Sequence, residues 1–198
     1  MAASTQHDRP RLSIADFRTF VATRPDEEHW ELIDGAAMMM APPTKAHQRI
    51  ASNLERLLND ALQRMNPALA AYQRVGLNLA PMSKDYDPEP DVVVIDADDA
   101  TDERYADRFY LVAEIVSASD RKTVQLKRRM YKLHATCTCV LAIRQDRYEA
   151  RVDLRSQAGW SETLLQRPND ALAVSDFGLR CTLADLYSGT PLNPRRTR

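Results

Sequence analysis

The sequence of 198 residues lacks any apolar run close to the roughly 20 residues that a membrane-spanning helix needs. Its N-terminus also lacks the apolar core of a signal peptide. The net charge is close to zero, because the sequence has 27 Lys and Arg residues and 28 Asp and Glu residues. This balance excludes the strongly basic composition by which many nucleic-acid-binding proteins are recognised. We therefore expect a cytoplasmic protein that does not enter a membrane, and any basic surface must be local.

Cysteine is scarce as well. The sequence has three cysteines, of which Cys137 and Cys139 are two positions apart and Cys181 is distant. An odd number without regular spacing excludes a disulfide framework, and no second Cys or His pair completes a zinc site. We expect three free thiols that pack as small buried hydrophobic side chains.

What is present is the composition of a globular protein, with 44% hydrophobic and 28% charged residues. The length favours one domain. We expect a flexible N-terminus over residues 1–11, a single domain over residues 12–190 and a basic tail over residues 191–198.

The order of expected helices and strands is that of a mixed α/β domain. Asp34-Gly35 between two short apolar runs predicts a β-hairpin over residues 30–40. Apolar residues three and four apart predict a helix over 44–65, and another should run from a cap at Ser119 or Asp120 to about His134. The continuous apolar runs at 91–95 and 109–116 predict central strands buried on both faces. The other expected elements are a helix from Ser13 to Val21, strands over 72–79, 139–143 and 148–154, and an edge at Leu164-Leu165.

Three acidic residues occupy informative positions. Glu114 lies inside an apolar strand, where a carboxylate must be paired, protonated or bound to a metal. Asp91 begins the other central strand, and Glu31 lies on the hairpin. Taken singly, each has an ordinary alternative: a salt bridge for Glu114, a solvated turn for Asp91 and an exposed strand position for Glu31. Together they indicate a site for a hard cation such as Mg²⁺ or Mn²⁺, which prefers oxygen ligands.

The helix over residues 120–134 supplies positive charge near these acids. Lys127, Tyr131 and His134 should lie along one border of its apolar stripe, from which a side chain can reach a cleft. A lysine beside a cation can stabilise the charge that develops during phosphodiester cleavage. The remaining basic residues form either a solvated helix face or a surface that neutralises phosphates; they are Arg121, Lys122, Arg128, Arg129 and Lys132.

From residue 12 to residue 187 the sequence resembles the Uma-type restriction endonucleases of the PD-(D/E)XK nuclease superfamily. The matching segments, in order, are Trp30–Gly35, Pro42-Pro43 with His47, Pro90–Val94, Glu114–Ser119, and Lys127 with Tyr131.

The resemblance implies a restriction-endonuclease-like fold, in which a mixed central sheet is flanked by helices and preceded by a hairpin. It implies that Asp91 and Glu114 bind the divalent cation, that Glu31 assists and that Lys127 is the catalytic lysine. His47 and Tyr131 match positions of auxiliary residues, and the homodimers common in the superfamily become an expectation.

The chain departs from the usual pattern at two positions. The superfamily's lysine commonly lies two residues after the second acid, where this chain has Val116, so Lys127 on the helix takes that role. The family also often carries an acid three residues before this lysine, where the chain has Val124.

We expect metal-dependent hydrolysis of phosphodiester bonds by water, as in a DNA endonuclease, with Lys122, Arg128 and Arg129 contacting nucleic acid. Two alternatives remain. One is a module that binds nucleic acid or another partner on a nuclease fold without cleaving. The other is a structural scaffold, whose acids form salt bridges with the helix over residues 121–132.

Overall fold

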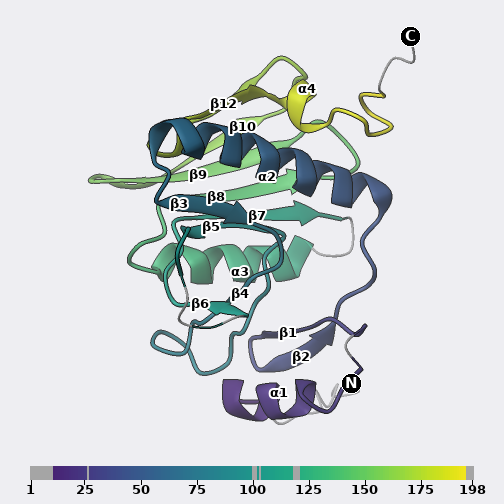
Figure 1. The fold of residues 1–198 in the computed structure, drawn as a ribbon. Coiled ribbons are helices and arrows are strands. Elements are labelled where there is room, and N and C mark those ends of the chain that lie inside the picture. Colours follow the sequence, from purple (N-terminus) through teal and green to yellow (C-terminus); the bar gives the residue numbers. More distant parts are fainter. Residues whose placement is uncertain (1–10, 26, 100–101, 103, 118–120, 195–198) are drawn as a thin grey trace, which may run out of the picture.

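A mixed six-stranded sheet lies at the centre of the computed structural model, which describes residues 11–25, 27–99, 102, 104–117 and 121–194 (Figure 1). The strand order is β10-β9-β8-β7-β5-β3, and only β7 and β8 pair in parallel. The strands are β3 (Leu69–Tyr72), β5 (Val92–Asp96), β7 (Leu111–Val116), β8 (Cys139–Arg144), β9 (Ala150–Ser156) and β10 (Gly159–Leu165).

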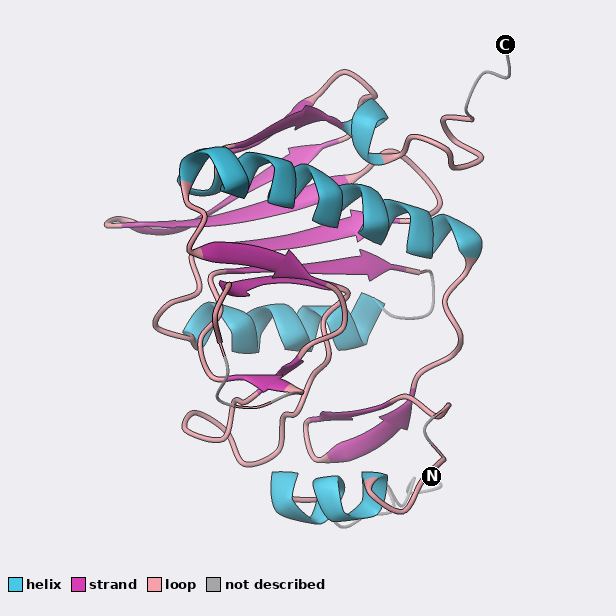
Figure 2. Cartoon of the chain, viewed as in Figure 1, coloured by secondary structure: helices cyan, strands magenta, loops and turns pink. Residues whose placement is uncertain are grey.

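Helices cover both faces of this sheet, which explains why its central strands are continuously apolar (Figure 2). On one face, α2 (Lys45–Met65) packs through Ile50, Leu54 and Leu58 against residues that include Val92. On the other face, α3 (Arg121–Leu133) packs through Tyr131 against the side of the sheet that carries Val93 and Val112. The parallel connection from β7 to β8 passes through α3.

The remaining elements form two groups, one that packs mainly with the hydrophobic cluster on the α3 face of the sheet and one that packs with the cluster on the α2 face. The N-terminal group is α1 (Ile14–Val21), the antiparallel hairpin β1 (Trp30–Ile33) with β2 (Ala36–Met39), and the short parallel pair β4 (Gly76–Leu77) with β6 (Tyr105–Ala106). The C-terminal group is β11 (Ala171–Val174) paired with β12 (Leu179–Thr182), the 3₁₀ turn η1 (Ser175–Phe177) and the single turn α4 (Leu183–Leu186).

The Asp34-Gly35 turn of the hairpin follows from backbone geometry. Both residues have positive φ, 53° and 75°, as a tight two-residue turn requires. A side chain at Gly35 would also collide with Arg11, because a Cβ there would lie 2.7 Å from the Arg11 Cβ. The hairpin is fastened by α1, where Phe17 and Ile14 pack with Leu32.

The mixed α/β fold with its N-terminal hairpin is therefore confirmed, as are both long helices, the hairpin and the central strands. The strand expected over residues 72–79 is wrong, because the chain bends at Arg74, whose φ is 60°, and leaves β3 and β4 as separate short strands. The C-terminal pair β11–β12 and α4 were not expected. The proposed helix caps Ser119 and Asp120, and nearly all of the expected flexible N-terminus, lie outside the described residues.

The three cysteines are buried and free, as expected. Burial raises the pKa of the Cys137 thiol to about 12 and that of Cys181 to about 11, which makes both unreactive. No helix within the described ranges is long and apolar enough to cross a membrane.

Arg128 corrects the expectation of a solvated basic helix face. It is buried, and its guanidinium donates to Asp153 on β9 and to Glu162 on β10. Lys132 donates to the other oxygen of Asp153. These ion pairs hold α3 against the sheet and leave Arg128 unavailable for phosphate, whereas Lys122 and Arg129 are exposed.

Asp153→Ala should lower the free energy of unfolding by about 3 kcal/mol, because Arg128 would lose its buried carboxylate partner and keep only the partly exposed Glu162. The measurement is urea denaturation followed by circular dichroism. The control is Asp60→Ala, which breaks the exposed Arg56–Asp60 pair and should change the free energy by less than about 0.5 kcal/mol. Equal losses in the two variants would contradict the importance of the buried network.

Candidate active site

The register of the central strands brings Asp91 and Glu114 together. Val92 on β5 pairs with Ala113 on antiparallel β7, so the preceding residue, Asp91, stands opposite Glu114. Side chains directly opposite in such a pair share one face of the sheet. The Ile115 N–H donates to Asp91 Oδ2 over 2.6 Å, which fixes the carboxylate at the start of β5.

Glu114 is buried under α3 and receives hydrogen bonds from two residues of that helix. The Tyr131 hydroxyl donates to Glu114 Oε1 over 2.7 Å, and Lys127 Nζ donates to Oε2 over 3.0 Å. Lys127 and Tyr131 are four positions apart, so one helix face presents both. The salt bridge that was the ordinary alternative for Glu114 is present, and of the three residues expected along the helix border, Lys127 and Tyr131 meet at Glu114.

Lys127 also joins the sheet to the hairpin. Its Nζ lies 2.8 Å and 3.1 Å from the two carboxylate oxygens of Glu31 on β1. Glu31 Oε1 accepts a further hydrogen bond, from the backbone N–H of Glu89. The ordinary alternative for Glu31 was an exposed strand position. Glu31 is instead buried together with Lys127 and Glu114, and each of the three is less than 5% exposed.

Burial sets the electrostatics of this cluster. It raises the pKa of Glu114 to about 8, an effect that Lys127 opposes and the carboxylates of Asp91 and Glu31 reinforce. Glu114 and Glu31 in turn raise the pKa of Lys127 against its own desolvation, so the ammonium keeps its charge. Burial raises the pKa of Tyr131 well above its ordinary value, so the phenol remains a donor to Glu114.

His47 reaches Asp91 from α2, the helix that covers the opposite face of the sheet from α3. It lies in the first turn of α2, whose cap Thr44 accepts a hydrogen bond from the His47 backbone N–H. The ring atom Nε2 is 2.8 Å from Asp91 Oδ1. Asp91 therefore contacts strand β7 and helix α2, and both of its oxygens have a partner.

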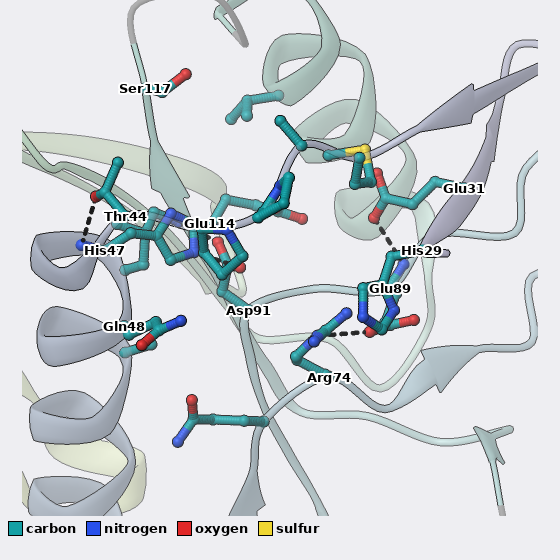
Figure 3. Close-up of a pocket in the computed structure, with 18 of the residues that line it drawn as sticks. His29, Glu31, Thr44, His47, Gln48, Arg74, Glu89, Asp91, Glu114 and Ser117 are labelled. Atoms are coloured by element: carbon teal, nitrogen blue, oxygen red, sulfur yellow. Dashed lines mark hydrogen bonds and ion pairs between the residues drawn. The ribbon is translucent and has the colours of Figure 1, made fainter. Parts of the chain in front are cut away.

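A cavity of about 780 Å³ lies where β5 begins and β7 ends, and all of these side chains except that of Tyr131 line it. Figure 3 shows His47, Asp91 and Glu114 meeting on one side of it, with Glu31, Glu89 and Arg74 on the other. Arg74 Nε donates to Glu89 Oε1 over 2.9 Å. Met38–Met40, Ala41 and the two prolines that follow add an apolar wall.

Five of the residues selected from sequence thus line one cavity: Glu31, His47, Asp91, Glu114 and Lys127. Tyr131 lies behind Glu114 and has no exposed surface. His134 does not join them, because it stacks on Phe109 with ring centroids 4.2 Å apart. Lys122 and Arg129 are not among the residues that line the cavity.

Arg74 and Glu89 were missed by the sequence analysis. Nothing in the sequence marks Arg74, since its place in the cavity depends on the left-handed backbone that ends β3. The two positions at which the chain departs from the expected pattern lie together in the structure, because Val116 and Val124 pack with Ala142 in a small buried cluster.

The donor chemistry of the cavity fits a hard cation. Asp91 and Glu114 offer carboxylate oxygens, the ligands that Mg²⁺ and Mn²⁺ prefer. Among the described residues, no group of three or more His, Cys, Asp or Glu side chains is arranged to hold a metal ion. Two carboxylates with water and substrate oxygens completing the shell are the usual arrangement for Mg²⁺.

The raised pKa of Glu114 predicts a particular dependence of stability on pH. Between about 4.3, where a glutamate titrates in an unfolded chain, and about 8, the folded protein holds a proton that the unfolded chain has released. Unfolding then releases a proton, so the stability that Glu114 contributes falls as the pH rises.

Glu114→Gln removes this titration. The free energy of unfolding of the wild type relative to Glu114→Gln should fall by up to about 1.4 kcal/mol for each pH unit within that window. Urea denaturation of both proteins at several pH values measures the difference. A difference that stays constant with pH would show that Glu114 does not titrate there.

The sequence and the fold were compared with those of known proteins. The search of curated proteins finds no match. A crystal structure of a protein from Anabaena variabilis, described as "a putative nuclease belonging to DUF820", is similar in fold with a TM-score of 0.68. The two share 17% sequence identity over 89% of this chain and 97% of that chain. The model of the Uma2 family, described as "putative restriction endonuclease", matches residues 14–184, and the chain therefore belongs to this family.

Proposed function

We propose that the protein is a DNA endonuclease that hydrolyses phosphodiester bonds with the help of Mg²⁺ or Mn²⁺. The observation that carries the proposal is the convergence of Asp91, Glu114 and Lys127 in one cavity, with two carboxylates and one ammonium from three different elements. Family membership and the shared fold support a nuclease. The cation and the DNA substrate are proposed from the chemistry of the side chains.

Asp91 and Glu114 would hold the cation. When bound, it would withdraw electron density from the phosphoryl group and acidify the attacking water. The Asp91 carboxylate is oriented for this by His47 and by the Ile115 N–H. Tyr131 orients Glu114 in the same way, through its hydrogen bond to Oε1.

Lys127 would stabilise the negative charge that develops on the phosphate. Its ammonium is desolvated and held between Glu31 and Glu114, so it is already positioned before substrate enters. Glu31 acts through Lys127 as a positioning residue. Exclusion of water from this cluster strengthens each of these electrostatic interactions.

One observation favours the scaffold alternative. Lys127 already pairs with both Glu31 and Glu114, as a purely structural role for these acids would require. In a purely structural role Asp91 would need no cation, because it already pairs with His47. Metal binding therefore separates the two functions.

Titration of Mn²⁺ into the wild type by calorimetry should give one binding site, which Asp91→Asn should weaken at least tenfold through loss of a charged ligand. The matched control is Asp96→Asn, at the other end of β5, where Asp96 pairs with exposed Arg108 outside the cavity. Absence of binding to the wild type would favour the scaffold.

The same proteins should then be incubated with supercoiled plasmid. Wild type and Asp96→Asn should nick it only when Mg²⁺ or Mn²⁺ is added, whereas Asp91→Asn and Glu114→Gln should lose at least about a thousandfold in rate. Circular dichroism should show that the variants remain folded. Nicking by Glu114→Gln at the wild-type rate would remove Glu114 from the mechanism.

A further inference from the structure

One wall of the cavity is apolar and unusually exposed. It is the segment Met38–Pro43, hereafter the methionine wall, which comprises the end of β2 and the residues that lead to α2. Met38 and Met39 are 37% and 61% exposed, although large apolar side chains are normally covered. Met65 and Leu133 are exposed to a similar degree elsewhere, but Met38 and Met39 line the cavity that holds the charged groups, where a ligand could cover them.

The hairpin register places the wall directly beside the buried cluster. Met38 on β2 pairs with Glu31 on β1, so the two side chains stand on the same face of the hairpin. Glu31 in turn holds Lys127. Met38 therefore lies in the cavity wall beside the residue that holds Lys127.

The dimensions of the cavity restrict what can enter. Glu31, Glu114 and Lys127 are almost wholly buried at its inner end. A volume of about 780 Å³ lies within the range of roughly 300–1,000 Å³ in which proteins enclose small molecules. One or two nucleotides fit such a space. A strand that is free of its partner can bend a phosphodiester towards these buried groups more readily than a stiff double helix can.

The charges in the cavity show where affinity must come from. Among the described lining residues, the carboxylates of Glu31, Glu89, Asp91 and Glu114 outnumber the two permanent cations, Arg74 and Lys127. Attraction of the phosphate backbone is therefore weak here. Unstacked bases instead present apolar faces, and methionine is flexible enough to pack against any of them.

We propose that the substrate is an unpaired nucleic-acid strand, whose bases lie against the methionine wall while a phosphodiester reaches Asp91, Glu114 and Lys127. This inference rests on the nuclease function proposed above and specifies its substrate. A duplex is acted on where it is locally open, because only a separated strand enters the cavity.

Binding is tested apart from cleavage. A fluorescent single strand of mixed sequence, and the same sequence closed into a duplex with looped ends, are titrated with protein in Ca²⁺ and also in EDTA, and anisotropy is recorded. The wild type should bind the single strand at least tenfold more tightly. The double variant Met38→Gln with Met39→Gln should lose about fivefold in affinity for the single strand, which corresponds to about 1 kcal/mol, because the apolar contact with the bases is lost.

Met65→Gln is the matched control, because Met65 is 55% exposed at the end of α2 and does not line the cavity. It should leave binding unchanged, and thermal melting should show that all variants fold. Equal or tighter binding of the duplex, no binding of the single strand, or equal effects of the two substitutions would overturn the inference. So would a change of oligomeric state in the double variant with unchanged strand affinity, since the wall would then contact a second copy.

Cleavage of the same two substrates in Mg²⁺ separates the inference from the proposed function. Preferential cleavage of the single strand, reduced in the double variant, supports both. Equal cleavage of the closed duplex overturns the inference while leaving a nuclease. Strand binding that depends on the methionine wall, without cleavage of either substrate, overturns the nuclease function and leaves the strand-binding surface in place.

Discussion

The candidate site depends on one interaction, the placement of the Lys127 ammonium between the carboxylates of Glu31 and Glu114. It connects three parts of the fold that are remote in sequence: the hairpin, the central strand β7 and helix α3. Each of these charged groups would be strongly unfavourable in the interior without the others. The position of the hairpin on the sheet, and hence the shape of the cavity between them, follows from this cluster.

Much of the fold was predictable because its signals are local. The Asp34-Gly35 turn, the apolar spacing of α2 and the continuous apolar strands each depend on a few neighbouring residues. Arg128 was misjudged because a helix pattern tells which residues share a face but does not reveal Asp153 on the strand that the face meets. Helix α4 had a signal that was overlooked, the Thr182 and Asp185 capping box. The bend at Arg74 has no local signal.

The site was predictable for a different reason. A carboxylate within an apolar strand, as at Glu114, requires a partner, and the resemblance supplied the candidates. What remained hidden was the distribution of contacts: that Glu31 holds Lys127, that His47 holds Asp91, and that Val116 and Val124 pack against each other. These contacts join residues far apart in the chain, and only the strand register and helix packing determine them.

The pairing of Glu31 with Lys127 spans 96 positions. During synthesis the hairpin and Asp91 emerge from the ribosome before Lys127 has been added to the chain. Until α3 has been synthesised and has docked, neither Glu31 nor Glu114 has its counterion, and the cavity lacks its inner end. A chain that stops before α3 therefore lacks Lys127, and the cluster that joins the hairpin, β7 and α3 can form only after most of the domain has been made.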